Sequence, residues 1–187
     1  MNDQSTPKQN SGGLALMPDW MANVHIRHAK QADLLAMEWE GEYSRFRRIY
    51  FQVYQRTQRG SAIIWVADLL HVGVIGLVLV QLTAIKKPEL ANGIKRAYVH
   101  SFRVRLAFRR AGLGTRLMQT VEMDLVERGY TEITLNVIRT NTGALRLYLD
   151  LGYKVIGEDP GCWSYYDENN VLQEVKEPGW RLLKVLE

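Results

Sequence analysis

The pattern of apolar and polar positions along the chain predicts five β-strands before residue 140. Apolar and polar residues alternate in the first and last of these stretches, and apolar residues gather in short runs in the others; both patterns are typical of strands. The stretches are 24–27, 61–68, 72–83, 95–106 and 133–137. Only a short turn around Leu70 and His71 separates the second stretch from the third, so we expect these two to form an antiparallel hairpin.

Four further stretches predict helices, because their apolar residues recur at three- and four-residue steps. They are 31–40, 46–54, 112–128 and 142–151. Gly129 and Gly152 follow the last two stretches directly, where a glycine commonly ends a helix. Asn141 or Thr142 can cap the start of the last one.

The remainder of the chain, from residue 153, predicts two or three more strands, with breaks at 167–170 and 178–179. The resulting order is a strand, two helices, three strands, a helix, a strand, a helix and terminal strands. This order indicates an α/β (α+β) fold around one sheet. A length of 187 residues favours one domain. We therefore expect a flexible N-terminal tail over 1–22 and a single domain over 23–187.

Composition narrows the function classes only slightly. The net charge of +4 would suit a phosphate-bearing ligand but equally suits an ordinary polar surface. No basic stripe with interleaved aromatic residues stands out, so nucleic-acid binding is not expected. The longest apolar run, 72–80, is far shorter than the roughly 20 residues of a membrane-spanning helix, so we expect no membrane partner.

The cysteine and histidine residues give a similar picture. Cys162 is the one cysteine, so an internal disulfide cannot form, and the polar N-terminus does not resemble a signal peptide. The expected location is therefore a reducing cytoplasm. His25, His28 and His71 have no partners at metal-binding spacing, and no metal is expected.

The most informative stretch runs from the 95–106 strand through 109–114 (RRAGLG) into the 112–128 helix. Main-chain N–H groups at the start of a helix are unpaired and lie at the positive end of the helix dipole, where a pyrophosphate can accept several of them. Gly112 and Gly114 carry no side chains, so phosphates can approach the main chain closely and positive φ angles are allowed. The alternative is that the glycines simply form a tight turn between a strand and a helix, with a structural role alone.

Two other phosphate-binding loops do not fit this stretch. A P-loop needs Gly-Lys-Ser/Thr, whereas Gly114 is followed by Thr115 and Arg116. A dinucleotide-binding fingerprint needs a small third residue at position 117, where this chain has Leu117.

Two motifs resemble the GCN5-related N-acetyltransferase (GNAT) family. Residues 109–114 match its R/Q-x-x-G-x-G/A motif, and 141–153 (NTGALRLYLDLGY) resemble its N-x-x-A-x-x-L/F-Y…G-F/Y signature. The element order from Val24 onward is also similar to that fold. The resemblance implies a central mixed, mostly antiparallel sheet flanked by helices, and acetyl-CoA as co-substrate.

The same resemblance implies a mode of acetyl-CoA binding. In the family, the fourth and fifth strands splay apart, and the pantetheine arm of CoA pairs with the free edge of the fourth strand. Main-chain amides at the start of the following helix, with help from nearby arginines, hold the phosphates. The residues implied in binding are Phe102, Arg103, Val104, Arg109, Arg110, Ala111, Gly112, Leu113, Gly114, Thr115 and Asn141.

Tyr148 and His100 are the predicted catalytic residues. The family reading assigns to Tyr148 the role of general acid, because a phenol of pKa ~10 can donate to a departing thiolate whose conjugate acid has a pKa of ~8.5. The alternative is an ordinary core aromatic. The acceptor amine must lose a proton, and His100 stands where many family members place a glutamate. Either His100 or a water chain would then be the base.

The predicted function is transfer of the acetyl group from acetyl-CoA directly to a primary amine, by a transferase without a metal. The acceptor, a small molecule or a peptide or protein, is not identified by the sequence, which also leaves a homodimer open. The rival hypothesis is a non-catalytic acyl-CoA-binding regulatory module.

Overall fold

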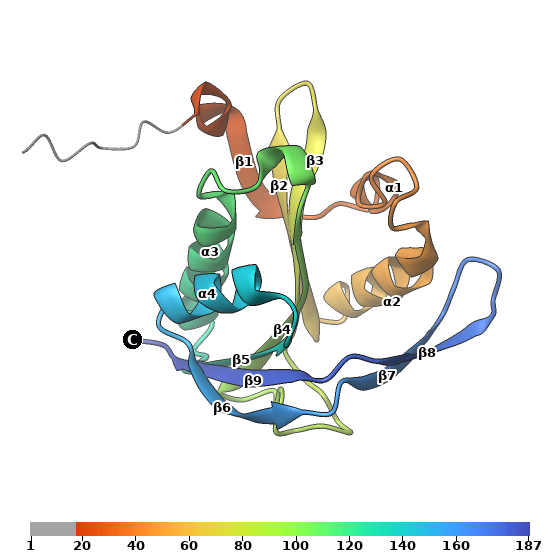
Figure 1. Ribbon diagram of the computed structural model, residues 1–187. Helices are drawn as coiled ribbons and strands as arrows, with labels where there is room; N and C mark the ends of the chain where they lie inside the picture. The colour runs from red at the N-terminus through yellow and green to blue at the C-terminus, as the bar shows by residue number, and fades with distance from the viewer. Residues whose placement is uncertain (1–17) are drawn as a thin grey trace, which may run out of the picture.

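The computed structural model describes residues 18–187, which form a central seven-stranded sheet with helices on both faces (Figure 1). The strand order is β1-β2-β3-β4-β5-β9-β6, and of the neighbouring pairs in this sheet only β4 and β5 run parallel. The strands are β1 (Val24–His28), β2 (Ala62–Leu69), β3 (Gly73–Gln81), β4 (Arg96–Val104), β5 (Glu132–Ile138), β6 (Lys154–Asp159) and β9 (Gly179–Val185). A separate hairpin pairs β7 (Cys162–Tyr166) with β8 (Leu172–Lys176).

The helices lie on opposite faces of the sheet (Figure 1). One face carries α1 (Asp33–Ala36) and α2 (Arg47–Thr57), and the other carries α3 (Leu113–Glu127) and α4 (Thr142–Asp150). Three short 3-10 helices complete the described chain: η1 (Asp19–Asn23), η2 (Ser44–Phe46) and η3 (Leu106–Phe108). The predicted mixed, mostly antiparallel sheet with flanking helices is therefore confirmed.

Each face of the sheet has its own apolar core. Val78 and Val80 of β3 pack with Leu117 on the α3 face, whereas Leu77 and Leu79 pack with Tyr50 on the α2 face. Because successive side chains of a strand point to opposite faces, a strand covered on both sides is apolar along its whole length. This explains why β3 reads as an unbroken apolar run.

A β-bulge in β4 changes which side chains face which helix. Leu79 pairs with His100, but Leu77 pairs with Arg103, so two residues of β4 lie opposite one residue of β3. Ser101, inside the bulge, has a φ of 50°. The extra residue turns both His100 and Arg103 toward α2, and it turns Phe102 toward α3 and α4.

The parallel pairing of β4 with β5 ends early. It runs from Arg96 opposite Glu132 to Val99 opposite Leu135, whereas β4 continues to Val104. Residues 100–104 therefore have a main-chain edge without a partner from β5. This is the splay that the family resemblance implied for the fourth and fifth strands.

The helix predicted over 31–40 is much shorter than expected, with α1 covering Asp33–Ala36 alone. Trp39 and Glu40 have φ angles of 45° and 56°, which no α-helix allows. Trp39 is held in place by burial and by the hydrogen bond that its Nε1 donates to the Val74 carbonyl, at 2.9 Å. Tertiary packing has overridden the helical spacing in this segment.

The domain also begins earlier than the predicted boundary at residue 23. Residues 1–17 of the expected tail lie outside the described residues, but η1 packs against the domain. Met21 is buried, and Trp20 meets Phe108 edge-on with ring centroids 5.1 Å apart. Arg116 donates a hydrogen bond to the Met21 carbonyl. Residues assigned to the tail thus belong to the packed fold.

The terminal segment forms four strands rather than two or three. The predicted break at 167–170 is present, whereas the one expected at 178–179 lies at 177–178, because β9 begins at Gly179; a third break at Pro160 and Gly161 separates β6 from β7. Gly161 has a φ of 66°, and a Cβ on it would overlap the Glu177 carbonyl. The turn therefore depends on a close main-chain approach from a distant segment.

We predict that Leu117→Ala lowers the free energy of unfolding by about 2–5 kcal/mol. Leu117 has no exposed surface, and its Cδ1 lies only 2.9 Å from where a Cβ on Gly76 would stand, so α3 and β3 are already in close contact. Chemical denaturation measures the loss. Met123→Ala, at a 61% exposed position of the same helix, is the control and should change the value by less than about 0.5 kcal/mol. Equal losses would contradict the prediction.

Candidate active site

The loop before α3 presents a row of unpaired main-chain amides. Arg110 and Gly112 have φ angles of 63° and 88°, and Gly112 is the N-cap residue of α3. The first helical hydrogen bond runs from the Arg116 amide to the Gly112 carbonyl. The amides of 110–115 make no hydrogen bond to any residue within 18–187. These donors lie at the positive end of the α3 dipole, an arrangement that favours anions.

The two glycines of this loop serve different physical purposes. A Cβ on Gly112 would meet nothing within 4 Å, so this position requires glycine for its left-handed conformation and leaves open space above the amides. A Cβ on Gly114 would lie 3.2 Å from Cζ of Phe102 and 3.3 Å from Cδ2 of Leu147. Gly114 therefore allows α3 to approach β4 and α4 closely.

The predicted arginines and the asparagine have partners within the protein. Arg109 donates from Nε to the Val104 carbonyl at 2.7 Å, which fixes the loop to the end of β4. The guanidinium of Arg110 lies beside Gly143, at the start of α4. The Asn141 side chain accepts a hydrogen bond from the Ala144 amide and thus caps α4.

Tyr148 extends from α4 toward the splayed end of β4. Its ring lies between Phe102 and Tyr153, with centroid separations of 6.3 and 5.7 Å, and only 5% of the residue is exposed. Its hydroxyl has no hydrogen-bond partner among the described residues, yet the oxygen is not sealed from solvent. Burial, and to a lesser degree Tyr98, raises the pKa of Tyr148 above its usual range, so the group stays protonated and able to donate.

His100 lies on the opposite face of β4, toward α2. Its ring stacks on Tyr98 at 5.6 Å, and its Nδ1 is 3.3 Å from Oγ of Ser101. Burial, reinforced by the positive charges of Arg56 and Arg103, lowers the pKa of His100 to about 4. The ring is therefore neutral near pH 7 and offers a lone pair, but it is a weak base. The two predicted catalytic residues thus approach the splayed strand from opposite faces.

The side chain of Arg103 points away from the predicted phosphate loop. It lies under α2, where its guanidinium stacks on Tyr43 and Phe46 and donates to the Tyr50 hydroxyl. Sequence reasoning placed Arg103 in cofactor binding but gave no role to its side chain. The alternation of side chains along a strand assigns Arg103 and Phe102 to opposite faces. Which face each one takes depends on the bulge, which the alternation does not reveal.

A polar cluster around Asp159, near the α2 face, was not predicted from the sequence. Asp159, at the end of β6, accepts hydrogen bonds from Asn136 of β5 and Arg181 of β9, both at 2.8 Å. Tyr98 is close enough that this carboxylate, after burial, contributes to raising its pKa to about 12. The three strands are far apart in sequence, so no local motif could have signalled the cluster.

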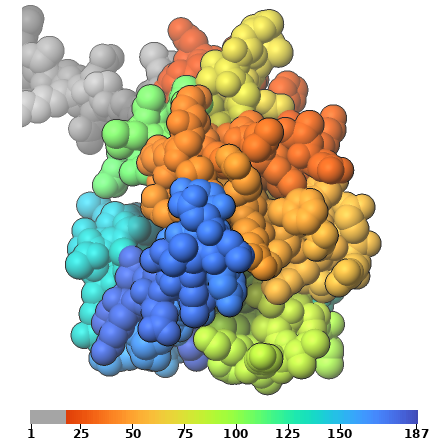
Figure 2. Space-filling model, turned by 90° about the vertical axis from the view of Figure 1, so that its right-hand side faces the viewer, coloured from red at the N-terminus to blue at the C-terminus, as the bar shows by residue number. Residues whose placement is uncertain are grey.

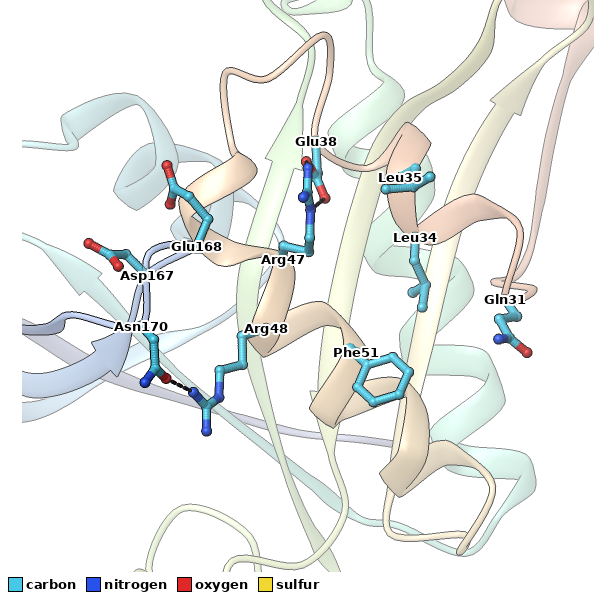
Figure 3. A pocket seen from close by; sticks show the side chains of 10 residues that line it. All are labelled: Gln31, Leu34, Leu35, Glu38, Arg47, Arg48, Phe51, Asp167, Glu168 and Asn170. Carbon is cyan, nitrogen blue, oxygen red and sulfur yellow. Dashed lines mark hydrogen bonds and ion pairs between the residues drawn. The ribbon is translucent and has the colours of Figure 1, made fainter.

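The β7–β8 hairpin crosses to α2 and closes this side of the molecule (Figure 2). Arg48 donates to Asn170 and lies over the Tyr166 ring, and Phe46 contacts Tyr165 at a centroid separation of 5.1 Å. A surface cleft of about 520 Å³ lies outside α2, between α1 and the hairpin turn (Figure 3). Its lining includes the Glu38–Arg47 ion pair but none of the predicted site residues.

No three His, Cys, Asp or Glu side chains within residues 18–187 gather closely enough to hold a metal ion. In the same part of the chain, no helix is both long and apolar enough to cross a bilayer.

The model of the acetyltransferase (GNAT) family matches residues 29–153, which include both motifs, the splayed strands and the loop before α3. This chain belongs to the GNAT family. It is therefore an acetyl-CoA-dependent N-acetyltransferase, as its two motifs predicted.

Solved structures of acetyltransferases share the fold. An N-acetyltransferase from Staphylococcus aureus is 16% identical, with a TM-score of 0.67 over 88% of this chain and 99% of the other. The putative acetyltransferase yncA from Salmonella typhimurium, solved with acetyl-CoA, is 16% identical, with a TM-score of 0.67 over 88% and 95%. The ribosomal-protein-S18-alanine N-acetyltransferase from Escherichia coli is 15% identical, with a TM-score of 0.64 over 88% and 94%. No curated protein matches the chain in sequence.

We predict that His100 makes the protein less stable as the pH falls from about 6.5 to about 4. In the unfolded chain the imidazole of His100 has a pKa of ~6.5, whereas in the folded protein its pKa is about 4. Between these two pH values the unfolded state therefore binds more protons, and lowering the pH favours unfolding. The free energy of unfolding should fall by up to about 1.4 kcal/mol per pH unit from this group. Denaturation at several pH values should show a smaller slope for His100→Gln. Identical slopes would refute the lowered pKa.

Proposed function

We propose that this N-acetyltransferase binds acetyl-CoA through residues 102–104 and 109–115 and transfers the acetyl group directly to a primary amine. One observation carries the assignment of the binding residues. Only the short η3 separates the unpaired edge of β4 beyond Val99 from the unpaired amides of 110–115. An extended arm can pair with the first, and a pyrophosphate can accept hydrogen bonds from the second.

The residues present suit acetyl-CoA, which supplies an activated acetyl thioester. The main chain of 102–104, along the edge of β4 that β5 leaves unpaired, would hold the pantetheine arm. Arg110, at the mouth of the loop, would add a charge-assisted contact to phosphate. Arg109 acts mainly by fixing the loop, since its Nε is already bonded to the Val104 carbonyl. Asn141 acts by capping α4 and so holds Tyr148 in place.

Tyr148 is the proposed general acid. Its ring is fixed against Phe102 and Tyr153, while its hydroxyl is free to donate. A phenol whose pKa is raised by burial stays protonated and can donate a hydrogen bond to the departing sulfur, although the same rise makes it a weaker acid for full proton transfer. A core aromatic that is merely packed would more commonly bond its hydroxyl to the protein.

His100 is the proposed acceptor of the amine proton, directly or through water. A neutral imidazole can accept a hydrogen bond from the amine, but a pKa of about 4 limits its strength as a base. The rate would therefore come mainly from proximity and orientation of the amine and the thioester.

The rival reading, a non-catalytic acyl-CoA-binding module, gives no role to a free Tyr148 hydroxyl. We also propose that the enzyme acts in a reducing cytoplasm, where Cys162 stays free.

Replacing Gly112 with glutamate should abolish acetyl-CoA binding. The space above Gly112 is open, and a carboxylate placed there would repel phosphate and occupy its site. Calorimetric titration with acetyl-CoA measures the loss. Gly112→Ala imposes the same left-handed strain, of about 1–2 kcal/mol, without the charge and should retain most of the binding. Undiminished affinity in the glutamate variant would remove the loop from the binding site.

Tyr148→Phe should lower kcat by about 100-fold or more while leaving the affinity for acetyl-CoA unchanged. The substitution removes the proton donor and keeps the ring that packs against Phe102 and Tyr153. Steady-state kinetics with an amine acceptor and calorimetry with acetyl-CoA separate the two effects. An unchanged kcat would eliminate Tyr148 as the acid and favour its reading as a core residue.

A further inference from the structure

Arg103 is a partly buried cation held in an aromatic setting on the α2 face of β4. The carbon of its guanidinium lies 4.5 Å from the ring centre of Tyr43 and 4.6 Å from that of Phe46. One of its nitrogens donates to the Tyr50 hydroxyl at 2.6 Å. Tyr50 is fully buried, so this contact fixes the guanidinium in one position.

No carboxylate among the described residues forms an ion pair with Arg103. Of the acids on the chain segment before α2, Glu38 pairs with Arg47 and Glu40 with Arg105, and Glu42, beside Tyr43, forms no ion pair with Arg103. Burial lowers the pKa of Arg103, as expected for a cation without a counter-charge. Buried cations are normally paired with an anion, which makes Arg103 a candidate partner for an anionic ligand.

Arg103 has donors that the protein itself leaves unused. A guanidinium has five N–H groups, and the protein uses one nitrogen of Arg103. Its other nitrogens make no hydrogen bond to the described residues, yet they are not sealed from solvent. Two parallel N–H groups of this kind match the two oxygens of a carboxylate.

An apolar wall stands beside this cation. Phe46 contacts Tyr165 of the β7–β8 hairpin, and Tyr165 stacks on Trp163 at a centroid separation of 5.2 Å. Trp163 is 41% exposed, so part of this aromatic surface remains accessible to a ligand. Together, Tyr43, Phe46, Trp163 and Tyr165 offer contact area to an apolar group.

The location of Arg103 connects this anion site to the reaction. Its main chain belongs to the segment proposed to pair with the pantetheine arm, while its side chain points to the same face as His100. A group held by the guanidinium thus lies on the side from which an acceptor would approach. The positive charge of Arg56, which contributes to lowering the pKa of His100, would also favour the neutral, nucleophilic form of a nearby amine.

We propose that the acceptor is a small amine that carries a carboxylate, an amino acid with an apolar side chain. Arg103 binds the carboxylate, and the aromatic wall contacts the side chain. The N-terminal amine of a peptide has an amide in place of that carboxylate and would leave Arg103 unpaired. The inference names the acceptor class for the proposed transfer and so rests on the proposed function.

The test uses two pairs of acceptors that differ only by the carboxylate: L-phenylalanine with phenethylamine, and L-leucine with 3-methylbutylamine. Release of CoA thiol gives kcat/KM for each. We expect a preference for the amino acids on the order of 10- to 100-fold, the range of a hydrogen bond to a charged group. Arg103→Gln should abolish the preference, mainly through the acceptor KM, and Arg103→Lys should retain part of it.

Arg105→Gln is the matched control, because Arg105 follows β4 directly and already has Glu40 as its partner. This variant should keep the preference. Calorimetry with acetyl-CoA must show unchanged binding in all three variants, which also establishes that they fold. A wild-type enzyme that acetylates both members of each pair equally well, or only the amines, would overturn the inference and leave the proposed function intact.

A separate binding experiment keeps the two hypotheses distinguishable. If the wild-type protein fails to bind acetyl-CoA, the proposed function fails. N-acetyl-L-phenylalanine and N-acetylphenethylamine are then titrated into the protein alone and into Arg103→Gln. Binding of the carboxylate compound that is lost in the variant supports the anion site by itself, whereas no binding, or equal binding of both compounds, overturns it.

Discussion

The arrangement of the active site depends on how β4 leaves the sheet. Pairing with β5 stops after Val99, and the bulge at Ser101 adds a residue opposite β3. The first change frees main-chain donors and acceptors that a continuous sheet would consume. The second turns His100 and Arg103 toward one face and Phe102 toward the other. One strand can therefore present its main chain to one ligand and its side chains to another.

The proposed phosphate loop depends on the same strand, from which only the short η3 separates it. Arg109 is bonded to the last residue of β4, and Gly114 permits Phe102 and Leu147 to pack against the first turn of α3. The buried face of α3, which includes Leu117, holds the helix on the sheet and so fixes the direction of its dipole.

The sequence predicted those parts of the fold and site that are encoded locally. The strand, glycine loop and amphipathic helix are contiguous, so their signals reinforce one another, and the cap at Asn141 follows from its residue type. The prediction of a helix over 31–40 was wrong for most of that range, because the burial of Trp39 outweighed the helical spacing of the apolar residues. The direction of the Arg103 side chain and the cluster around Asp159 depend on a bulge and on pairing between distant strands, which periodicity does not report.

Burial shifts the pKa values of the two proposed proton-transfer groups in opposite directions. It disfavours charge, so it raises the pKa of Tyr148 and lowers that of His100, and both groups are neutral near pH 7. One can then donate and the other can accept before either has gained a charge. An acceptor carboxylate on Arg103 would neutralise one of the two positive charges that depress the pKa of His100. Binding such an acceptor would therefore strengthen the base at the moment when it is needed, whereas a simple amine would not.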